Sequence, residues 1–316
     1  MAAEKNFADR LARAIKEKNT PLIVGLDPVY ENLPPAIISR RGFDDGNSCA
    51  ARIDALSEFG RKIIHTVSPY VPAVKINIAY FERYLWEGVE AYYNLIQEAN
   101  GYGLLVIGDV KRGDVGHTST QYALGDLADC DWDDAGATLG PDAITINSYF
   151  GLDGITPFMD VAKASGKGAF ALLRTSNASA GQIQEIPAAD GRPMFLHIAE
   201  MIENWGSSWR GECGFSNLGA VVGATSGDAI GRIRRTMPHT IFLIPGIGAQ
   251  GGSLADCAPA FRPDGLGAII SASRSVIFAH RESRYAHIPA AQWTSAVQQA
   301  VLETKAYIAQ AIPAFQ

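Results

Sequence analysis

Short apolar runs recur along the chain, and the segments between them are long enough to form helices. Most of these runs are apolar without alternation, which is typical of strands covered on both faces in a parallel sheet. The pattern therefore predicts eight parallel strands. They are expected at Leu22 to Asp27, Ala73 to Asn77, Leu104 to Val110, Ala143 to Asn147, Ala169 to Arg174, Leu218 to Ala224, Ile241 to Pro245 and Ala268 to Ser273.

The intervening segments show helical periodicity. Apolar residues at helical spacing predict helices at 7–18 and 53–67. Their apolar faces consist of Phe7, Leu11, Ala14 and Ile15 in the first and of Ile53, Leu56, Phe59, Ile63, Ile64 and Val67 in the second. Eight alternating strand–helix units favour a closed (β/α)8 TIM barrel. A doubly wound open sheet is the alternative.

The chain has 316 residues, more than the roughly 250 of a typical barrel. No linker or repeat divides it, so we expect a single TIM-barrel domain over 1–316 with inserted loops. The extra length is expected around Val29 to Ala50, Asp126 to Pro141, Ala178 to Pro193 and Asn204 to Asn217.

Composition narrows the class of protein. Hydrophobic residues make up 47% and charged residues 19%, and the net charge of −6 argues against a general nucleic-acid binder. The four cysteines are scattered, without the spacing of a structural zinc site. The first residues do not resemble a signal peptide, and no apolar run approaches the roughly 20 residues that span a bilayer. We therefore expect a cytoplasmic protein without disulfides.

Candidate chemistry gathers after the third strand, in Asp109-Val110-Lys111-Arg112-Gly113-Asp114. In a strand, residues two apart share a face, so Asp109 and Lys111 should point the same way. Gly113 permits a turn that could bring Asp114 back toward the Lys111 amine. The sequence predicts an amine between two carboxylates.

Two more charged residues lie at or near the ends of neighbouring strands, Asp27 on the first and Lys75 on the second. A barrel enzyme places its chemistry at this C-terminal face. Together with Asp109, Lys111 and Asp114 they form an alternating set of charges. Unit charges ~4 Å apart attract by about 4 kcal/mol at an effective dielectric of 20. We expect such a network to remain ionised near neutral pH.

A glycine-rich segment follows the seventh strand, at 245–252, and contains a literal G-x-G-x-x-G. Dinucleotide domains place that motif after their first strand, so a dinucleotide site is a weak interpretation. Glycines after strand seven, with Ser273 and Arg274 after strand eight, match the usual barrel phosphate site. Backbone N–H groups and the Arg274 guanidinium would hold the phosphate oxygens.

These motifs together resemble the orotidine 5′-phosphate decarboxylase family, and in length its longer bacterial subfamily. The resemblance covers Leu22 to Ile277. Its carriers are Val24-Gly25-Leu26-Asp27, Val74-Lys75-Ile76-Asn77, Asp109-x-Lys111-Arg112-Gly113-Asp114-x-Gly116-x-Thr118, Leu173-Arg174-Thr175-Ser176-Asn177, Pro245-Gly246-Ile247-Gly248-Ala249-Gln250-Gly251-Gly252 and Ser271-x-Ser273-Arg274.

The resemblance implies conversion of orotidine 5′-phosphate to UMP and carbon dioxide in pyrimidine biosynthesis, without cofactor or metal, in a homodimer with shared sites. Lys111 would donate the proton to C6, and Asp109 would face the departing carboxylate. The family pattern implies further roles: Lys75 and Asp27 hold the ribose, Asp114 and Thr118 reach the neighbouring subunit's site, Ser176 meets the pyrimidine, and Gln250, Gly251, Ser273 and Arg274 bind the phosphate.

Two rival functions stay open from the residues alone. One is a related sugar-phosphate barrel that uses magnesium to stabilise an enediolate. It is disfavoured because Lys75 places an amine on strand two. The other is a barrel that binds nucleotides as a sensor, which the complete set of charged residues argues against.

Overall fold

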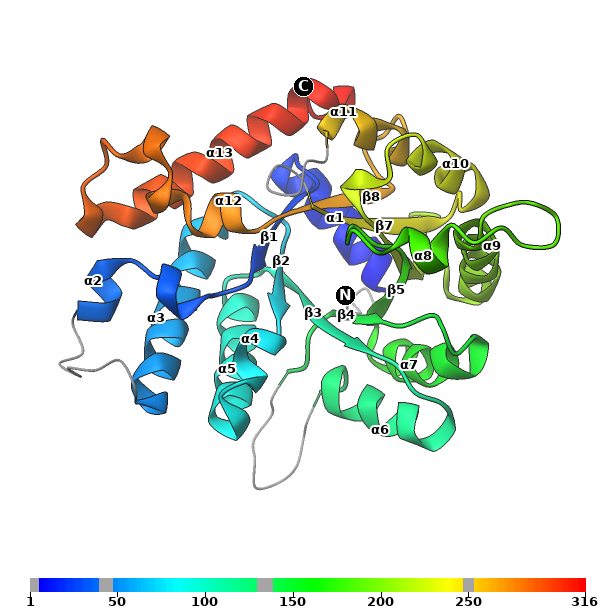
Figure 1. Ribbon diagram of the computed structural model, residues 1–316, viewed down its shortest axis with the longest axis horizontal. Coiled ribbons are helices and arrows are strands. Elements are labelled where there is room, and N and C mark those ends of the chain that lie inside the picture. Colours follow the sequence, from blue (N-terminus) through cyan, green and yellow to red (C-terminus); the bar gives the residue numbers. More distant parts are fainter. Residues whose placement is uncertain (1–5, 40–47, 130–138, 247–252) are drawn as a thin grey trace.

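Eight parallel strands close into one barrel, as the apolar pattern predicts (Figure 1). The computed structural model describes residues 6–39, 48–129, 139–246 and 253–316. Each strand pairs with the next in the chain, and β1 pairs with β8 to complete the ring. The strands are β1 Leu22–Leu26, β2 Ala73–Asn77, β3 Leu105–Arg112, β4 Ala143–Ile146, β5 Gly168–Arg174, β6 Ser216–Val222, β7 Thr240–Pro245 and β8 Ala268–Ala272. The (β/α)8 fold is confirmed, and the doubly wound alternative is excluded.

Helices surround the barrel and bury one face against it (Figure 1). The longer ones are α1 Phe7–Lys18, α3 Cys49–Val67, α5 Leu85–Gly101, α6 Gly116–Asp126, α7 Leu152–Ser165, α9 Met194–Gly206, α10 Ala229–Thr236 and α13 Trp293–Ala311. Four-residue helices are α2 Pro35–Ile38, α4 Ala79–Glu82, α8 Gly181–Gln184, α11 Leu254–Cys257 and α12 Arg274–Ile277. None of the described helices combines the length and apolar character needed to cross a lipid bilayer.

Helix α1 covers the end of the barrel where the strands begin. The Asn6 side chain accepts a hydrogen bond from the backbone N–H of Asp9 and so caps the helix. Phe7 is buried and meets the Phe170 ring edge-on, with 5.9 Å between centroids. A Cβ built on Gly168, the first residue of β5, would lie 2.5 Å from the Phe7 ring. The helix therefore packs directly onto the bottom of the sheet.

Strand β3 is the one that departs most from expectation. The apolar run predicts an end at Val110, but the strand continues to Arg112. Its pairing with β4 passes from Gly108–Ile144 to Arg112–Ile146, so β3 advances four residues while β4 advances two. The extra residues form a bulge. Lys111 lies in this bulge with a φ of +45°, a left-handed conformation that is uncommon outside glycine.

The expected loop insertions contain short helices. Residues Tyr30–Asn32 form a 3-10 turn before α2, and α8 lies within 178–193. The segment at 204–217 ends α9 and leads through a 3-10 turn at Ser207–Trp209 into β6. Parts of two predicted insertions, 40–47 and 130–138, lie outside the described residues. The three described cysteines, Cys49, Cys213 and Cys257, are free thiols.

Candidate active site

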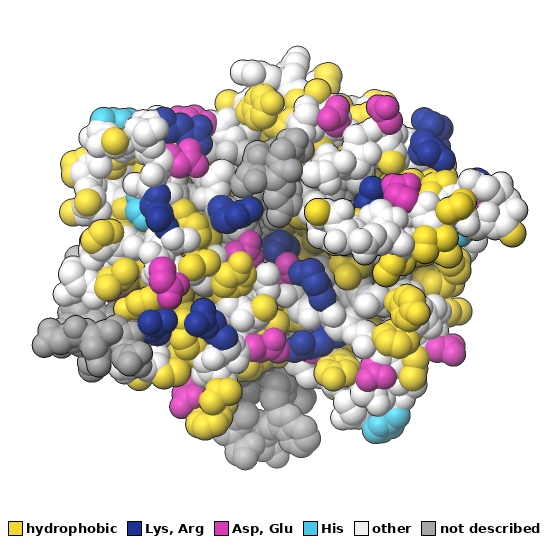
Figure 2. All heavy atoms as spheres, in the orientation of Figure 1, with side chains coloured by type: hydrophobic (Ala, Val, Ile, Leu, Met, Phe, Trp, Pro, Cys, Tyr) yellow, Lys and Arg dark blue, Asp and Glu magenta, His cyan; other side chains and the backbone are white. Residues whose placement is uncertain are grey.

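The charged residues predicted at the strand ends lie together at the C-terminal mouth of the barrel. Figure 2 shows basic and acidic side chains gathered in the hollow at the centre of this face. A cavity of about 450 Å³ opens there. Its lining combines the charged groups with apolar side chains from β5, β6 and β7: Lys75, Asp109, Lys111, Thr145, Leu172, Thr175, Ser176, Asn177, Val221, Leu243 and Pro245.

Sheet register explains how Lys75 reaches two carboxylates. Lys75 pairs in register with Gly25 of β1 and with Ile107 of β3. Asp27 and Asp109 each follow those partners by two residues, and so lie one step nearer the mouth on the same face. The Lys75 side chain extends upward between them. Its Nζ lies 2.6 Å from Asp109 Oδ2 and 3.7 Å from Asp27 Oδ1.

Asp109 is the centre of the network. Its other carboxylate oxygen, Oδ1, lies 2.6 Å from Lys111 Nζ and accepts a hydrogen bond of 2.9 Å from the Thr145 hydroxyl. Charges therefore alternate along the chain of contacts from Lys111 through Asp109 and Lys75 to Asp27. Asp109 and Lys75 are only 8% and 6% exposed, whereas the Lys111 side chain is 51% exposed.

The pKa shifts follow from burial and these neighbours. Burial alone raises the pKa of the Asp109 carboxyl, but the ammonium groups of Lys75 and Lys111 outweigh it and hold this pKa well below its usual range. Burial alone lowers the pKa of Lys75, but the carboxylates of Asp109 and Asp27 outweigh it and raise this pKa. Both groups are charged near neutral pH, as the sequence predicts.

The two carboxylate oxygens of Asp27 differ in their contacts. Its Oδ2 accepts a hydrogen bond of 2.5 Å from the hydroxyl of Ser273, whose oxygen also lies 3.0 Å from the carbonyl oxygen of Gly25. A Cβ on Gly25 would lie 3.0 Å from Ser273 Cβ, so glycine permits this close approach. Asp27 Oδ1 is buried and accepts no hydrogen bond from a described residue.

The remaining predicted site residues differ in whether they line the cavity. Ser176 lines the cavity. Arg274 is exposed at the start of α12. Burial and the Asp27 carboxylate raise the pKa of the Tyr80 phenol, and Arg274 lies close enough to oppose part of that shift. Gln250 and Gly251 lie outside the described residues.

Asp114 and Thr118 do not join this network within their own chain. The Asp114 carboxylate accepts a hydrogen bond of 2.8 Å from the backbone N–H of Val115. In the described part of the chain it forms no ion pair with Lys111, so the turn at Gly113 does not fold it back onto the amine. Thr118 is exposed in the first turn of α6.

Sequence reasoning missed Thr145 and Tyr80. Thr145 is the polar member of an otherwise apolar strand, β4, and that is the signal that could have identified it. No cluster of three or more His, Cys, Asp or Glu side chains suited to a metal ion occurs among the described residues.

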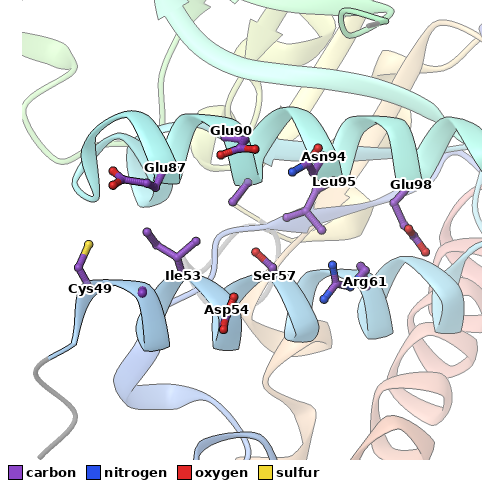
Figure 3. A pocket seen from close by; sticks show the side chains of 12 residues that line it. Cys49, Ile53, Asp54, Ser57, Arg61, Glu87, Glu90, Asn94, Leu95 and Glu98 are labelled. Carbon is purple, nitrogen blue, oxygen red and sulfur yellow. The ribbon is translucent and has the colours of Figure 1, made fainter. Parts of the chain in front are cut away.

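A second cavity, of about 570 Å³, lies between α3 and α5 on the outside of the barrel. Figure 3 shows the two helices side by side, with Glu87, Glu90 and Glu98 on α5 and Asp54 and Arg61 on α3. Four carboxylates against one guanidinium disfavour an anionic ligand. This groove therefore does not suit a phosphate ester.

Comparison with known proteins identifies the family to which the chain is similar. Residues 20–287 match the model of the "Orotidine 5'-phosphate decarboxylase / HUMPS family". The orotidine 5′-phosphate decarboxylase of Rhodopirellula baltica is 36% identical over 298 residues, which cover 94% of this chain and 97% of that protein. The one from Caldicellulosiruptor saccharolyticus is 37% identical over 290 residues, which cover 89% and 92%.

A solved structure, that of Leishmania donovani OMP decarboxylase, superposes with a TM-score of 0.72 at 29% identity, covering 97% of this chain and 98% of that one. The match in sequence thus extends over nearly the whole barrel, and the match in structure does as well. The chain belongs to the orotidine 5′-phosphate decarboxylase family.

Proposed function

We propose that this protein converts orotidine 5′-phosphate to UMP and carbon dioxide, with Lys111 as the proton donor and without a cofactor. The observation that carries the proposal is the alternating network of Lys111, Asp109, Lys75 and Asp27 at the barrel mouth. The family membership of the chain supports the same reaction.

The reaction places its main demand on Lys111. When the C6–carboxylate bond breaks, its electron pair stays on C6 as a vinylic carbanion, and carbon dioxide leaves. The pyrimidine offers no electron sink, so the protein must stabilise this charge electrostatically. The Lys111 ammonium is half-exposed in the cavity and held beside Asp109. It stabilises the carbanion, gives it a proton to form UMP, and regains a proton from water.

The other groups bind and orient the substrate. Asp109 faces the departing carboxylate, and a repulsion between the two is relieved as carbon dioxide leaves, although the ammonium contributes more. Lys75 and Asp27 hold the ribose hydroxyls, consistent with the buried Asp27 Oδ1 that lacks a described donor. Ser176 contacts the pyrimidine. Gln250, Gly251, Ser273 and Arg274 bind the phosphate.

We also propose a homodimer in which Asp114 and Thr118 complete the neighbouring subunit's site. Large apolar side chains are exposed beside them: Val115, the next residue in the chain, and Tyr149, which is 81% exposed and packs against Phe150. Phe150 packs against this segment, because a Cβ on Gly113 would lie 3.6 Å from its ring. A second copy that covers these side chains would remove apolar surface from water and stabilise the pair.

The remaining expectations complete the proposal. The chain acts as one domain over 1–316, since α13 near its C-terminus packs against α3 and β1 near its N-terminus. We place the enzyme in the cytoplasm, with a small-molecule substrate and no nucleic-acid or membrane partner.

Substitution of Lys111 tests the mechanism. We expect Lys111→Ala to abolish turnover, measured by the absorbance change of orotidine 5′-phosphate, while UMP binding stays measurable by calorimetry. Loss of both activity and UMP binding would point to a collapsed site, which unfolding curves of the variant distinguish. Near-normal turnover in a folded Lys111→Ala protein contradicts the proposal.

Mixing two inactive variants tests the shared site. If Asp114 serves the neighbour, a dimer of one Lys111→Ala and one Asp114→Ala subunit contains one intact site and one site that lacks both groups. Random exchange at equal amounts makes half of the dimers mixed, so activity should rise to about a quarter of the wild-type value. No recovery after proven subunit exchange contradicts a shared site.

A further inference from the structure

Thr145 makes two hydrogen bonds with a single hydroxyl at the centre of the site. It lies in β4, is 1% exposed, and donates to Asp109 Oδ1 at 2.9 Å. The hydroxyl oxygen of Thr145 also accepts a hydrogen bond of 2.9 Å from the backbone N–H of Lys111. One hydroxyl thus contacts the side chain of Asp109 and the main chain of Lys111.

The bulge in β3 makes this contact necessary. Between the Gly108–Ile144 and Arg112–Ile146 pairs, residues 109–111 of β3 stand opposite Thr145 alone. The regular ladder therefore offers no carbonyl partner to the Lys111 N–H, and the Thr145 hydroxyl supplies the acceptor. Lys111 adopts a φ of +45° at this point. A non-glycine residue keeps such a conformation only where its surroundings hold it.

We propose that Thr145 is a positioning residue that fixes the relative placement of the Lys111 amine and the Asp109 carboxylate. The inference rests on the proposed function, since it concerns how the proton donor is aimed. Its hydroxyl holds the bulge by accepting from Lys111 N–H, and it orients the carboxylate by donating to Asp109. The bulge in turn brings the Lys111 amine back to Asp109 Oδ1, at 2.6 Å.

Threonine suits this task better than other residues of similar size, such as valine and serine. Valine has nearly the same shape but can neither accept nor donate, so it would leave Lys111 N–H without an acceptor. Serine keeps both hydrogen bonds but loses the methyl group that restricts rotation about χ1. The role therefore depends on the hydroxyl, and the two substitutions separate it from simple packing.

The test compares Thr145→Val and Thr145→Ser in steady-state kinetics. A displacement of about 1 Å at a reacting group can cost roughly 100-fold in rate, so we expect kcat of Thr145→Val to fall by about that factor. The KM and the UMP affinity should change by less than about threefold, because ribose and phosphate contacts lie elsewhere. Thr145→Ser should recover kcat to within about fivefold of wild type.

Thr240→Val is the matched control. Thr240 is also a buried strand threonine whose hydroxyl donates to a carboxylate, Glu203 Oε2 at 2.8 Å, but it begins β7 at the opposite end of the barrel. It should lose stability as Thr145→Val does and keep its kcat. If Thr145→Val is too unstable to assay, Thr145→Ala against Thr145→Ser gives the same comparison, since these two differ only in the hydroxyl.

Each outcome decides the role of Thr145. A serine variant as slow as the valine variant, or a kcat of Thr145→Val near wild type, overturns the inference. Lys111→Ala, assayed in parallel, separates this from the function itself. If Lys111→Ala is inactive and Thr145→Val is normal, only the positioning role fails. If Lys111→Ala remains active, the lysine mechanism fails, and the inference, which rests on it, fails as well.

Discussion

Replacement of Asp109 by asparagine removes one negative charge and keeps the shape of the side chain. Asp109 forms ion pairs of 2.6 Å with both Lys75 and Lys111. After the change, Lys75 keeps one described carboxylate partner, Asp27 Oδ1 at 3.7 Å, and remains 6% exposed. Lys111 is half-exposed, and water can hydrate its ammonium instead. The cost of the substitution therefore falls mainly on Lys75.

The magnitude follows from that asymmetry. Loss of one partner from a buried ion pair costs about 3–5 kcal/mol, and Asp27, at 3.7 Å and without a hydrogen bond to Lys75, offsets only a small part of that cost. A solvent-exposed pair contributes about 0–1 kcal/mol, so the Lys111 contact adds little. We expect Asp109→Asn to lower the free energy of unfolding by about 3–5 kcal/mol at pH 7. Combining it with Lys75→Met should recover part of that loss, because the buried cation is gone while Asp27 keeps its hydrogen bond from Ser273.

Urea unfolding followed by circular dichroism measures this at a fixed protein concentration. Glu17→Gln is the control, since that carboxylate is exposed on α1 and forms a surface ion pair of 3.8 Å with Arg13. It should change the free energy by less than about 1 kcal/mol. A cost below about 1 kcal/mol for Asp109→Asn, or no recovery in the double variant, would refute the reasoning.

The same substitution has an acid signature. The pKa of Asp109 is depressed in the folded protein. Its contribution to stability is therefore complete above the unfolded pKa of about 4 and is lost as the pH falls toward the folded value. Wild-type stability should decline more steeply below about pH 4 than that of Asp109→Asn.

Three further predictions concern the phosphate, the metal and the barrel bottom. Arg274→Ala should raise KM for orotidine 5′-phosphate by about 10- to 100-fold, from loss of a charged hydrogen bond; an unchanged KM contradicts a phosphate role. EDTA should leave turnover unchanged, because the Lys75 ammonium repels a cation at the mouth, whereas loss of activity reversed by magnesium would favour the enediolate chemistry. Phe7→Ala should lower the free energy of unfolding by about 3–5 kcal/mol with kcat unchanged. Equal urea midpoints for Phe7→Ala and wild type would show that α1 contributes little.

The sequence predicts the strands well because their signal is local. Runs such as Leu22–Leu26 are apolar until a polar residue ends them, and the observed bounds lie within two residues of those predicted. The charged strand ends then converge because parallel strands finish at one face. Lys75 and Asp109 could be assigned to one cluster on that ground alone.

The bulge could not be predicted, because it depends on pairing between strands. Regular alternation predicts that Asp109 and Lys111 share a face, and they do meet, yet the backbone at Lys111 is left-handed rather than extended. Thr145 has the pattern of an ordinary core position in an apolar strand, and only its contact with the bulge distinguishes it. Asp114 forms no described ion pair with Lys111, and the local pattern around Gly113 could not show this.

Helix α1 has a kinetic consequence. Phe7 packs against β5 and side chains fill the barrel interior, so the described residues leave no passage at the end where the strands begin. Orotidine 5′-phosphate must enter, and UMP must leave, through the same opening at the opposite end. The two cannot occupy the cavity together, so UMP should inhibit competitively, and every turnover must wait for the mouth to clear before the next substrate can bind.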